Sequence, residues 1–365
     1  MERAAKEVFG EVYCSGVSVA DGGEGTTEAV IEAENGEKRF CKVHGPLMEE
    51  VTAEYGKLSE NRAILEMAAA SGLTLIEKER RDPLFTTSYG TGEMIRDALD
   101  QGFTDLSIAI GGSATNDGGM GCARALGVRF LDERGEELEG RGIDLERVAS
   151  IDLSGLDQRV RQASITVMCD VTNPLCGKDG ATYTFGKQKG GSAESLERLE
   201  NGMCRYRDVI RRQFGIDPDK IQGGGAAGGL GTALCVFLGG EMKSGIDTVL
   251  DLIHFDDRLQ GMDLVVTGEG RTDWQSCYGK VMQGVGMRAR KAGIPCVGLS
   301  GSLGEGAFQI YDYGVDSLMT SVDAAMTIEE ALARAQELYY CGAVRMFRFI
   351  KTGMRMTESR RTVSK

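Results

Sequence analysis

The chain has 365 residues, of which 41% are hydrophobic and 27% are charged, and its formal net charge is −13. This composition is ordinary for a globular protein of two or three domains. The acidic excess argues against a general nucleic-acid or anionic-membrane surface, and no apolar run reaches the ~18 residues of a membrane-spanning helix. A small anionic substrate remains compatible, because a few local Lys and Arg residues are enough to bind it.

Cysteine, histidine and glycine usage further limits the cellular compartment, the kind of metal site and the type of chain. The ten cysteines contain no CxxC pair and no secretory signal opens the sequence, which predicts free thiols in a cytoplasmic protein. The two histidines, His44 and His254, are too few for a His-rich metal site. The 52 glycines are about twice the usual share of roughly 7%. They are scattered along the chain, which indicates turns and element ends within a folded protein and not a flexible linker.

The first elements in chain order mix helices, strands and glycine turns. Residues 2–9 predict an amphipathic helix, and residues 13–19 predict a short strand that leads into the loop VADGGEG. A helix is expected over 25–33 and a strand over 39–47, ending at a Gly-Pro turn. We also expect a helix over 61–72 with a glycine stop, then a Gly/Thr-rich loop and a helix that ends at Gly102.

From residue 106 onwards the scheme strand, glycine loop, helix recurs. Strands are predicted at 106–110, 164–170, 262–267 and 294–299. Helices are predicted at 121–127 and 280–293, and the glycine-rich stretch 223–240 is expected to lead into an apolar helix. This recurrence predicts an α/β fold with a parallel sheet and crossover helices. In such sheets ligands bind at the carboxyl ends of the strands. The loops VADGGEG, IGGSATNDGG, CDVTNP, TGEGRTD and LSGS lie at those ends.

Two of these loops combine small residues with polar ones. In VADGGEG, Asp21 is a carboxylate placed where the backbone can approach a ligand closely. In GGSATNDGG, the following helix start has free N–H groups that suit a phosphate or carboxylate. Equally favoured is a capped loop whose polar side chains satisfy only local backbone. The candidate binding residues of the two loops are Gly22, Gly23, Glu24, Gly111, Gly112, Ser113, Thr115, Asn116 and Asp117.

Three further stretches carry charge. In TGEGRTD, Glu269 and Asp273 are hard oxygen donors that suit Mg²⁺, and Arg271 could clamp a phosphate. A surface ion cluster is the commoner meaning of such a stretch. Lys189 in FGKQKGG could hold phosphate charge or belong to a solvated pair. Asp170 could be a base, a metal ligand or a turn cap.

The sequence supports neither of two common nucleotide-binding motifs. The G-x-G-x-x-G at 223–228 is not preceded by a buried strand, so a nicotinamide dehydrogenase lacks its structural context. No G-x-x-x-x-G-K-[ST] motif occurs, which excludes a P-loop kinase. The remaining pattern of acidic glycine loops with isolated Lys and Arg suits metal-bridged phosphate chemistry.

Several stretches, in order, resemble the bacterial glycerate kinase family: VADGGEGT, VHGPLMEEVTAEYG, EMAAASGL, RDPLFTTSYGTGEMI, AIGGSATNDGGMG, CDVTNPLCG, FGKQKGG, GAAGGLGTAL, TGEGRTDWQS, the GK at 279–280 and GLSGS. The resemblance implies ATP-dependent phosphorylation of D-glycerate to 2-phosphoglycerate with Mg²⁺. It also implies a Rossmann-like domain made from residues 1–85 and 260–365, with a second α/β domain, 86–259, inserted between them.

The resemblance implies roles for the charged residues. Asp21, Asp170 and Asp273 are candidates for base or metal duty, and Glu269 is a further metal candidate. Lys189 and Arg271 would contact the substrate carboxylate or phosphate. Gly268, Gly270 and Lys280 complete the predicted binding set. The alternatives are a kinase for a related hydroxy acid and a non-catalytic paralogue that binds ligand. Homodimerisation stays open.

Two departures from the family's pattern stand out. Lys187 occupies a place where the family usually has proline, and we expect a small effect. The family's first strand and its APDSFKGS-like loop do not precede residue 2, so we expect about 15–25 residues to be absent from the start. We also expect the chain as written to be less stable or less active than a version extended upstream.

Overall fold

The computed structural model describes residues 1–23 and 25–363, with 357–363 described by their backbone alone. The described chain divides into two compact units, Ala20–Val249 and Met1–Val19 with Leu250–Lys365. The boundaries expected from the sequence placed residues 20–85 with the chain ends. The structure instead joins them to the inserted segment, because β3 (Arg62–Glu66) pairs in parallel with β4 (Asp105–Ala109) in one sheet.

The unit Ala20–Val249 contains a six-stranded sheet of order β1-β2-β3-β4-β7-β8. Its other strands are β1 (Glu37–His44), β2 (Glu50–Lys57), β7 (Ser164–Met168) and β8 (Glu241–Lys243). The four strands from β3 to β8 run parallel, as expected for an α/β fold, whereas β1 and β2 add an antiparallel edge. A separate antiparallel pair is formed by β5 (Arg129–Leu131) and β6 (Ser150–Asp152).

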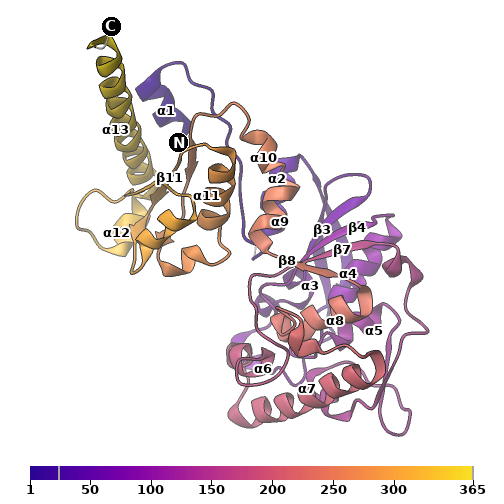
Figure 1. Cartoon of the computed structure of the whole chain (residues 1–365). Helices are drawn as coiled ribbons and strands as arrows, with labels where there is room; N and C mark the ends of the chain where they lie inside the picture. The colour runs from indigo at the N-terminus through magenta and orange to yellow at the C-terminus, as the bar shows by residue number, and fades with distance from the viewer. Residues whose placement is uncertain (24, 364–365) are drawn as a thin grey trace. The chain divides into compact units, whose positions relative to one another are not determined.

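Helices cover this sheet. The helices of the unit are α2 (Thr26–Glu34), α3 (Ala68–Ser71), α4 (Tyr89–Asp100), α5 (Met120–Ala125), α6 (Ala181–Phe185), α7 (Ala193–Phe214), α8 (Leu230–Leu238) and α9 (Gly245–Leu252), in which the division between the units falls. Helix α4 contacts β1 and α5, and α5 contacts α8, which lies against β7 and β8 (Figure 1). The apolar residues of β4 and β7 lie in the core between these layers, and this burial is the main stabilising term of such a layered fold.

Two expected elements are wrong. Residues 61–72, expected as one helix, form β3 and then the four-residue α3. A short apolar run such as RAILE suits a buried strand as well as a helix, and pairing with β2 and β4 decides between them. Residues 13–19, expected as a strand, form no strand. Strand propensity needs a neighbouring strand to take the backbone hydrogen bonds, and Tyr13 is exposed.

The unit formed by the two chain ends contains a parallel three-stranded sheet of order β13-β11-β9. Its strands are β9 (Val265–Thr267), β11 (Cys296–Ser300) and β13 (Ser317–Thr320), and β10 (Arg271–Thr272) pairs separately with β12 (Ser302–Leu303). Its helices are α1 (Glu2–Phe9), α10 (Phe255–Arg258), α11 (Val281–Ala292), α12 (Ile328–Ala333) and α13 (Ala335–Val363).

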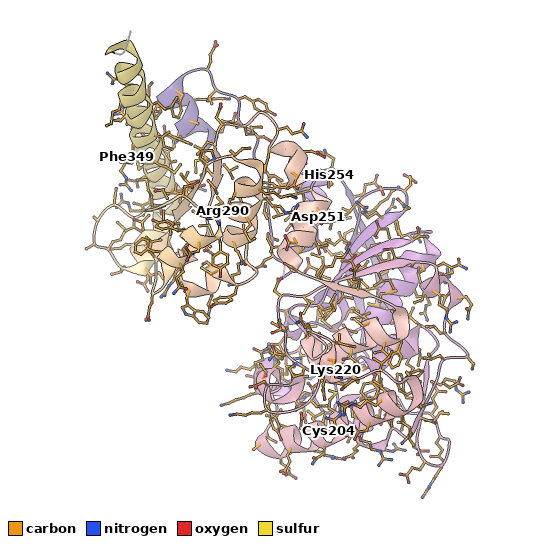
Figure 2. The ribbon with its side chains drawn as sticks, in the orientation of Figure 1. Cys204, Lys220, Asp251, His254, Arg290 and Phe349 are labelled. Carbon is orange, nitrogen blue, oxygen red and sulfur yellow. The ribbon has the colours of Figure 1, made fainter. Side chains whose placement is uncertain are left out.

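Helices α1 and α13 lie side by side, so the first and last elements of the chain share one core (Figure 1). Val8 of α1 and Phe347 of α13 are buried there with Leu299 of β11. Two positions after Phe347, Phe349 is 78% exposed on the same helix (Figure 2). None of the helices in the described part of the chain combines the length and apolar character that a bilayer crossing requires.

Candidate active site

Glycines bring the loop VADGGEG against the carboxyl ends of neighbouring strands. Gly22 has a φ of 90°, and a Cβ at this position would lie 3.1 Å from Gly245 Cα and 3.7 Å from Asp170 Oδ2. A Cβ at Gly111 would lie 3.3 Å from the carbonyl oxygen of Gly22. The loops after β4, β7 and β8 therefore meet around Gly22. This is the edge at which ligands bind in parallel sheets.

Asp170, two residues beyond β7, is the titratable group of this edge. Its Oδ1 accepts hydrogen bonds from the Gly245 N–H at 2.8 Å and the Ser244 hydroxyl at 3.3 Å. The pKa of the Asp170 carboxyl is raised to about 6, because desolvation by the surrounding atoms, together with the charge of Asp21, outweighs the lowering effect of the Gly245 hydrogen bond. The residue as a whole is exposed, so a ligand can reach it.

Glu66, at the end of β3, is a residue that the sequence reasoning missed. Its Oε1 accepts a hydrogen bond from the Thr27 N–H at 2.6 Å, and its Oε2 accepts one from the Gly25 N–H at 3.3 Å. The carboxylate thus holds the start of α2, where negative charge is stabilising. No sequence signal pointed to Glu66, because the run around it predicts a helix and not a strand that ends at this carboxylate. Glu24, a predicted binding residue, lies outside the described residues.

Lys189 is buried, so it is not part of the solvated lysine pair that the sequence left open beside a phosphate-holding role. It lies in a 3₁₀ turn, Lys187–Lys189, and only 2% of it is exposed, whereas Lys187 is exposed. Its Nζ donates hydrogen bonds to Ser113 Oγ and to the Thr115 carbonyl oxygen, each at 2.7 Å. Burial lowers the pKa of Lys189 to about 7, although the charge of Asp117 opposes this. Lys189 therefore anchors the loop after β4 from within.

Asp117 lies inside the same network. Its Oδ2 accepts hydrogen bonds from the N–H and hydroxyl of Ser88, both at 2.7 Å, and its Oδ1 accepts one from the Gly119 N–H at 3.0 Å. Desolvation raises the pKa of this fully buried carboxyl, and these hydrogen bonds oppose the rise. Thr115 Oγ1 and Asn116 Oδ1 are buried and have no hydrogen-bond partner among the described residues. Internal contacts thus hold Asp117 in place, whereas these two neighbouring oxygen atoms lack such a contact.

The burial of Lys189 predicts how stability depends on pH. Its pKa is lower in the folded chain than the ~10.4 of an unfolded one, so the unfolded state binds more protons between these values. Stability should therefore rise as the pH increases from about 7 towards 10. Lys189→Met should abolish this part of the rise, whereas Lys187→Met should not. Urea unfolding of the wild type and both variants at pH 7 and 9.5 measures the free energy of unfolding. Parallel pH profiles for wild type and Lys189→Met would contradict this expectation.

The unit of the chain ends holds the second set of predicted residues. Gly268 follows β9, and a Cβ there would lie 2.2 Å from the Leu299 carbonyl oxygen, so a larger residue does not fit. Glu269 Oε1 accepts hydrogen bonds from the hydroxyls of Thr272 and Ser276, at 2.9 and 2.5 Å. Thr272 and Ser300 share a further hydroxyl contact at 2.6 Å. The Glu269 carboxylate is therefore held in place by β10 and the turn after it.

Asp273 caps the turn Trp274–Cys277. Its Oδ1 accepts a hydrogen bond from the Gln275 N–H at 2.9 Å, and its Oδ2 lies 3.5 Å from Arg271 Nε. The Arg271 side chain is 66% exposed, so it can reach an anion. Lys280 is the residue before α11. Glu269 and Asp273 have the oxygen donors that Mg²⁺ prefers, and both are partly exposed, so this donor set fits the ion.

The predicted residues thus fall into two groups. One, in the unit Ala20–Val249, contains Asp21, Gly22, Gly23, Gly111, Gly112, Ser113, Thr115, Asn116, Asp117, Asp170 and Lys189. The other, in the unit of the chain ends, contains Gly268, Glu269, Gly270, Arg271, Asp273 and Lys280.

Comparison with known proteins matches these features to one family. Residues 1–351 match the family described as "Glycerate kinase family". The chain belongs to the glycerate kinase family. It is 44% identical to "Glycerate 2-kinase" of Escherichia coli (strain K12) over 338 residues, which are 92% of this chain and 89% of that protein. It is also 44% identical to "Glycerate kinase" of Bacillus subtilis (strain 168), over 92% of this chain and 88% of that protein.

A solved structure supports the same family. A crystal structure from Salmonella typhimurium LT2, whose protein is named as a candidate glycerate kinase 2, superposes with a TM-score of 0.86. The two sequences are 44% identical, and the match covers 97% of this chain and 93% of that one. The predicted α/β class is therefore confirmed, and so is the family that the sequence motifs suggested.

Proposed function

We propose that this chain transfers the γ-phosphoryl group of ATP to D-glycerate and forms 2-phosphoglycerate and ADP. The observation that carries the proposal is the family match over residues 1–351, together with the 44% identity to a protein named glycerate 2-kinase. Phosphoryl transfer of this kind depends on positioning and charge stabilisation. Both sets of charged, glycine-rich loops support such a role.

Asp170 is the residue that we propose as the general base. A base works best when its pKa lies near the operating pH, and its pKa of about 6 is closer to neutrality than that of an ordinary aspartate. The substrate hydroxyl passes its proton to the Asp170 carboxylate while its oxygen bonds to the γ-phosphorus. The bond from that phosphorus to the β-phosphate oxygen breaks, and ADP leaves.

The other charged residues would bind the substrates. Arg271 and Lys280 offer positive charge for a phosphate or a carboxylate, and Gly22 and Gly23 let the backbone approach a ligand closely. Glu269 and Asp273 would hold Mg²⁺. When bound with ATP, that ion would neutralise charge on the phosphate oxygens. Lys189 positions Ser113 and Thr115 through its two hydrogen bonds.

An assay coupled to ADP formation tests this function directly. Purified protein is mixed with ATP, Mg²⁺ and D-glycerate, and the phosphorylated position is determined by NMR. We expect D-glycerate-dependent ADP formation and 2-phosphoglycerate. Faster turnover of another hydroxy acid would make that acid, and not D-glycerate, the proposed substrate. Binding without turnover would favour a non-catalytic paralogue.

Removal of divalent cations should abolish turnover. The carboxylates Glu269 and Asp273 motivate this expectation, because hard oxygen donors suit Mg²⁺. EDTA in excess should reduce ADP formation to background, and added Mg²⁺ should restore it. Full activity in EDTA would remove the metal role from both residues.

We further propose a cytoplasmic location, because the protein would use ATP and its ten cysteines are free in the structure. Homodimerisation stays a prediction, which light scattering of the purified chain can test.

A further inference from the structure

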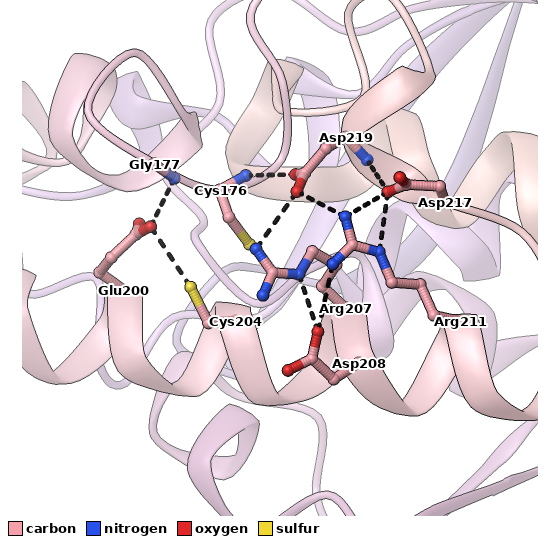
Figure 3. Close-up of polar contacts among 9 residues, drawn as sticks. All are labelled: Cys176, Gly177, Glu200, Cys204, Arg207, Asp208, Arg211, Asp217 and Asp219. Carbon is pink, nitrogen blue, oxygen red and sulfur yellow. Dashed lines mark hydrogen bonds and ion pairs between the residues drawn. The ribbon is translucent and has the colours of Figure 1, made fainter.

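Two cysteines and a glutamate that the proposed catalysis does not use meet in the unit Ala20–Val249 (Figure 3). Cys176 lies in the loop after β7, whereas Glu200 and Cys204 lie one turn apart on α7. The two Sγ atoms and a carboxylate oxygen of Glu200 all lie within 4.8 Å of one another. Among the residues that the structure describes, no other set of three potential metal ligands is this close.

Only one of the two oxygens of the Glu200 carboxylate has hydrogen-bond partners among the described residues. Its Oε1 accepts hydrogen bonds from the Gly177 N–H at 2.6 Å and from Cys204 Sγ at 3.6 Å. Its Oε2 is buried and has no hydrogen-bond partner among the described residues, and only 7% of the residue is exposed. An unpaired buried carboxylate oxygen is costly. A cation bound by Glu200 beside the two sulfurs would offset the negative charge of this buried carboxylate.

The neighbouring charges do not oppose a cation. The Arg207 guanidinium donates to Asp208 at 2.9 Å and to Asp219 at 3.2 Å, and Arg211 donates to Asp217 at 2.6 Å (Figure 3). Three carboxylates thus balance two guanidinium groups. Asp219 also accepts a hydrogen bond from the Cys176 N–H at 3.0 Å, which holds the loop beside α7.

We propose that Cys176, Glu200 and Cys204 form a binding site for a thiophilic divalent cation of the Zn²⁺ class. Thiolate ligands select such ions over Mg²⁺, and three protein ligands leave a fourth tetrahedral position for water. On binding, each thiol forms a metal–sulfur bond and releases its proton to solvent. The bound ion would tie the loop that follows Asp170 to α7. This site does not depend on the proposed kinase activity.

Burial raises the pKa of the Cys176 thiol in the ion-free chain, and desolvation does the same for Cys204. Both sulfurs are therefore protonated at neutral pH until an ion displaces the protons. The sequence alone could not show this cluster, because α6, the turn Lys187–Lys189 and the first half of α7 separate Cys204 from the loop that carries Cys176. Only the packing of that loop on α7 brings them together.

Titration of the full chain with Cd²⁺, a thiophilic probe, tests the site. The reduced, metal-free protein is followed by thiolate-to-cadmium absorption, and Zn²⁺ affinity is measured against a chromophoric chelator. We expect one tightly bound equivalent in the wild type. Cys176→Ser and Cys204→Ser should each lose it, and Glu200→Gln should weaken it at least about tenfold. The matched control Cys235→Ser, a partly buried cysteine on α8, should retain it.

Thermal unfolding gives a second measurement. Zn²⁺ should raise the melting temperature of the wild type and of Cys235→Ser but not of Cys204→Ser. If Cys176→Ser fails to fold, Cys204→Ser and Glu200→Gln still decide the question. An equivalent that survives Cys204→Ser, an unchanged affinity in Glu200→Gln, or a Cys176–Cys204 disulfide without ion binding would each overturn the proposal.

Discussion

Asp170→Asn should lower the kcat for glycerate phosphorylation by about 10²-fold or more, the usual scale for loss of a general base. Asparagine keeps an oxygen that can accept the Gly245 and Ser244 hydrogen bonds, so the loop should hold its shape. The KM values for ATP and D-glycerate should change much less than kcat. Steady-state kinetics at saturating Mg²⁺ measures both quantities.

Stability separates a catalytic Asp170 from a structural one. Because its pKa is raised on folding, the carboxyl stabilises the fold fully only below its unfolded pKa of about 4. That contribution is lost as the pH rises through about 6. Asp170→Asn should therefore be at least as stable as the wild type at pH 8. A lower melting temperature with kcat within threefold of wild type would make Asp170 a turn cap.

A charge control completes this test. Glu241→Gln removes an exposed carboxylate from β8, in the same sheet, and should leave kcat within threefold of the wild type. A loss comparable with that of Asp170→Asn would indicate a general electrostatic effect on ligand binding. The kcat of the wild type should also fall below pH 6, where Asp170 becomes protonated.

Asp273→Asn should lower kcat by at least about 10²-fold, the usual scale for losing one group that supports charge stabilisation in the transition state, because this carboxylate would hold Mg²⁺. Asparagine is as good a helix cap as aspartate, so the hydrogen bond from the Gln275 N–H should survive. The loss should therefore appear in turnover and in the Mg²⁺ concentration needed for half-maximal rate. Titration of activity with Mg²⁺ measures this, and circular dichroism checks the fold.

The matched control is Asp263→Asn, which removes an exposed carboxylate just before β9 in the same unit. It should leave the Mg²⁺ dependence unchanged. A change of less than threefold in Asp273→Asn would return this residue to the role of a surface turn cap. Its contact with Arg271 would then be an ordinary exposed ion pair of small energetic effect.

Local sequence determined the elements whose signals do not depend on distant partners. The apolar runs of β4 and β11 and the glycine stop after α11 predicted those elements where they occur. The order of acidic glycine loops determined the family, because many specific motifs in one order leave little alternative. The family match over residues 1–351 confirms that part of the interpretation.

Long-range packing decided what local signals could not. The run RAILE became β3 because β2 and β4 accept its backbone hydrogen bonds. Lys189 became a buried anchor because Ser113 and Thr115, more than seventy positions earlier, take both of its hydrogen bonds.

Local sequence was also insufficient to predict the chemical properties of two sites, Asp170 and the cluster of Cys176, Glu200 and Cys204. The sequence identified Asp170 as a carboxylate after a strand, but the raised pKa comes from the atoms and charges folded around it. The sequence contained Cys176, Glu200 and Cys204 without any recognisable spacing, and the packing of a loop on α7 places their ligand atoms together. Residue types and local order are written in the sequence, whereas desolvation and proximity between distant segments exist only in the folded chain.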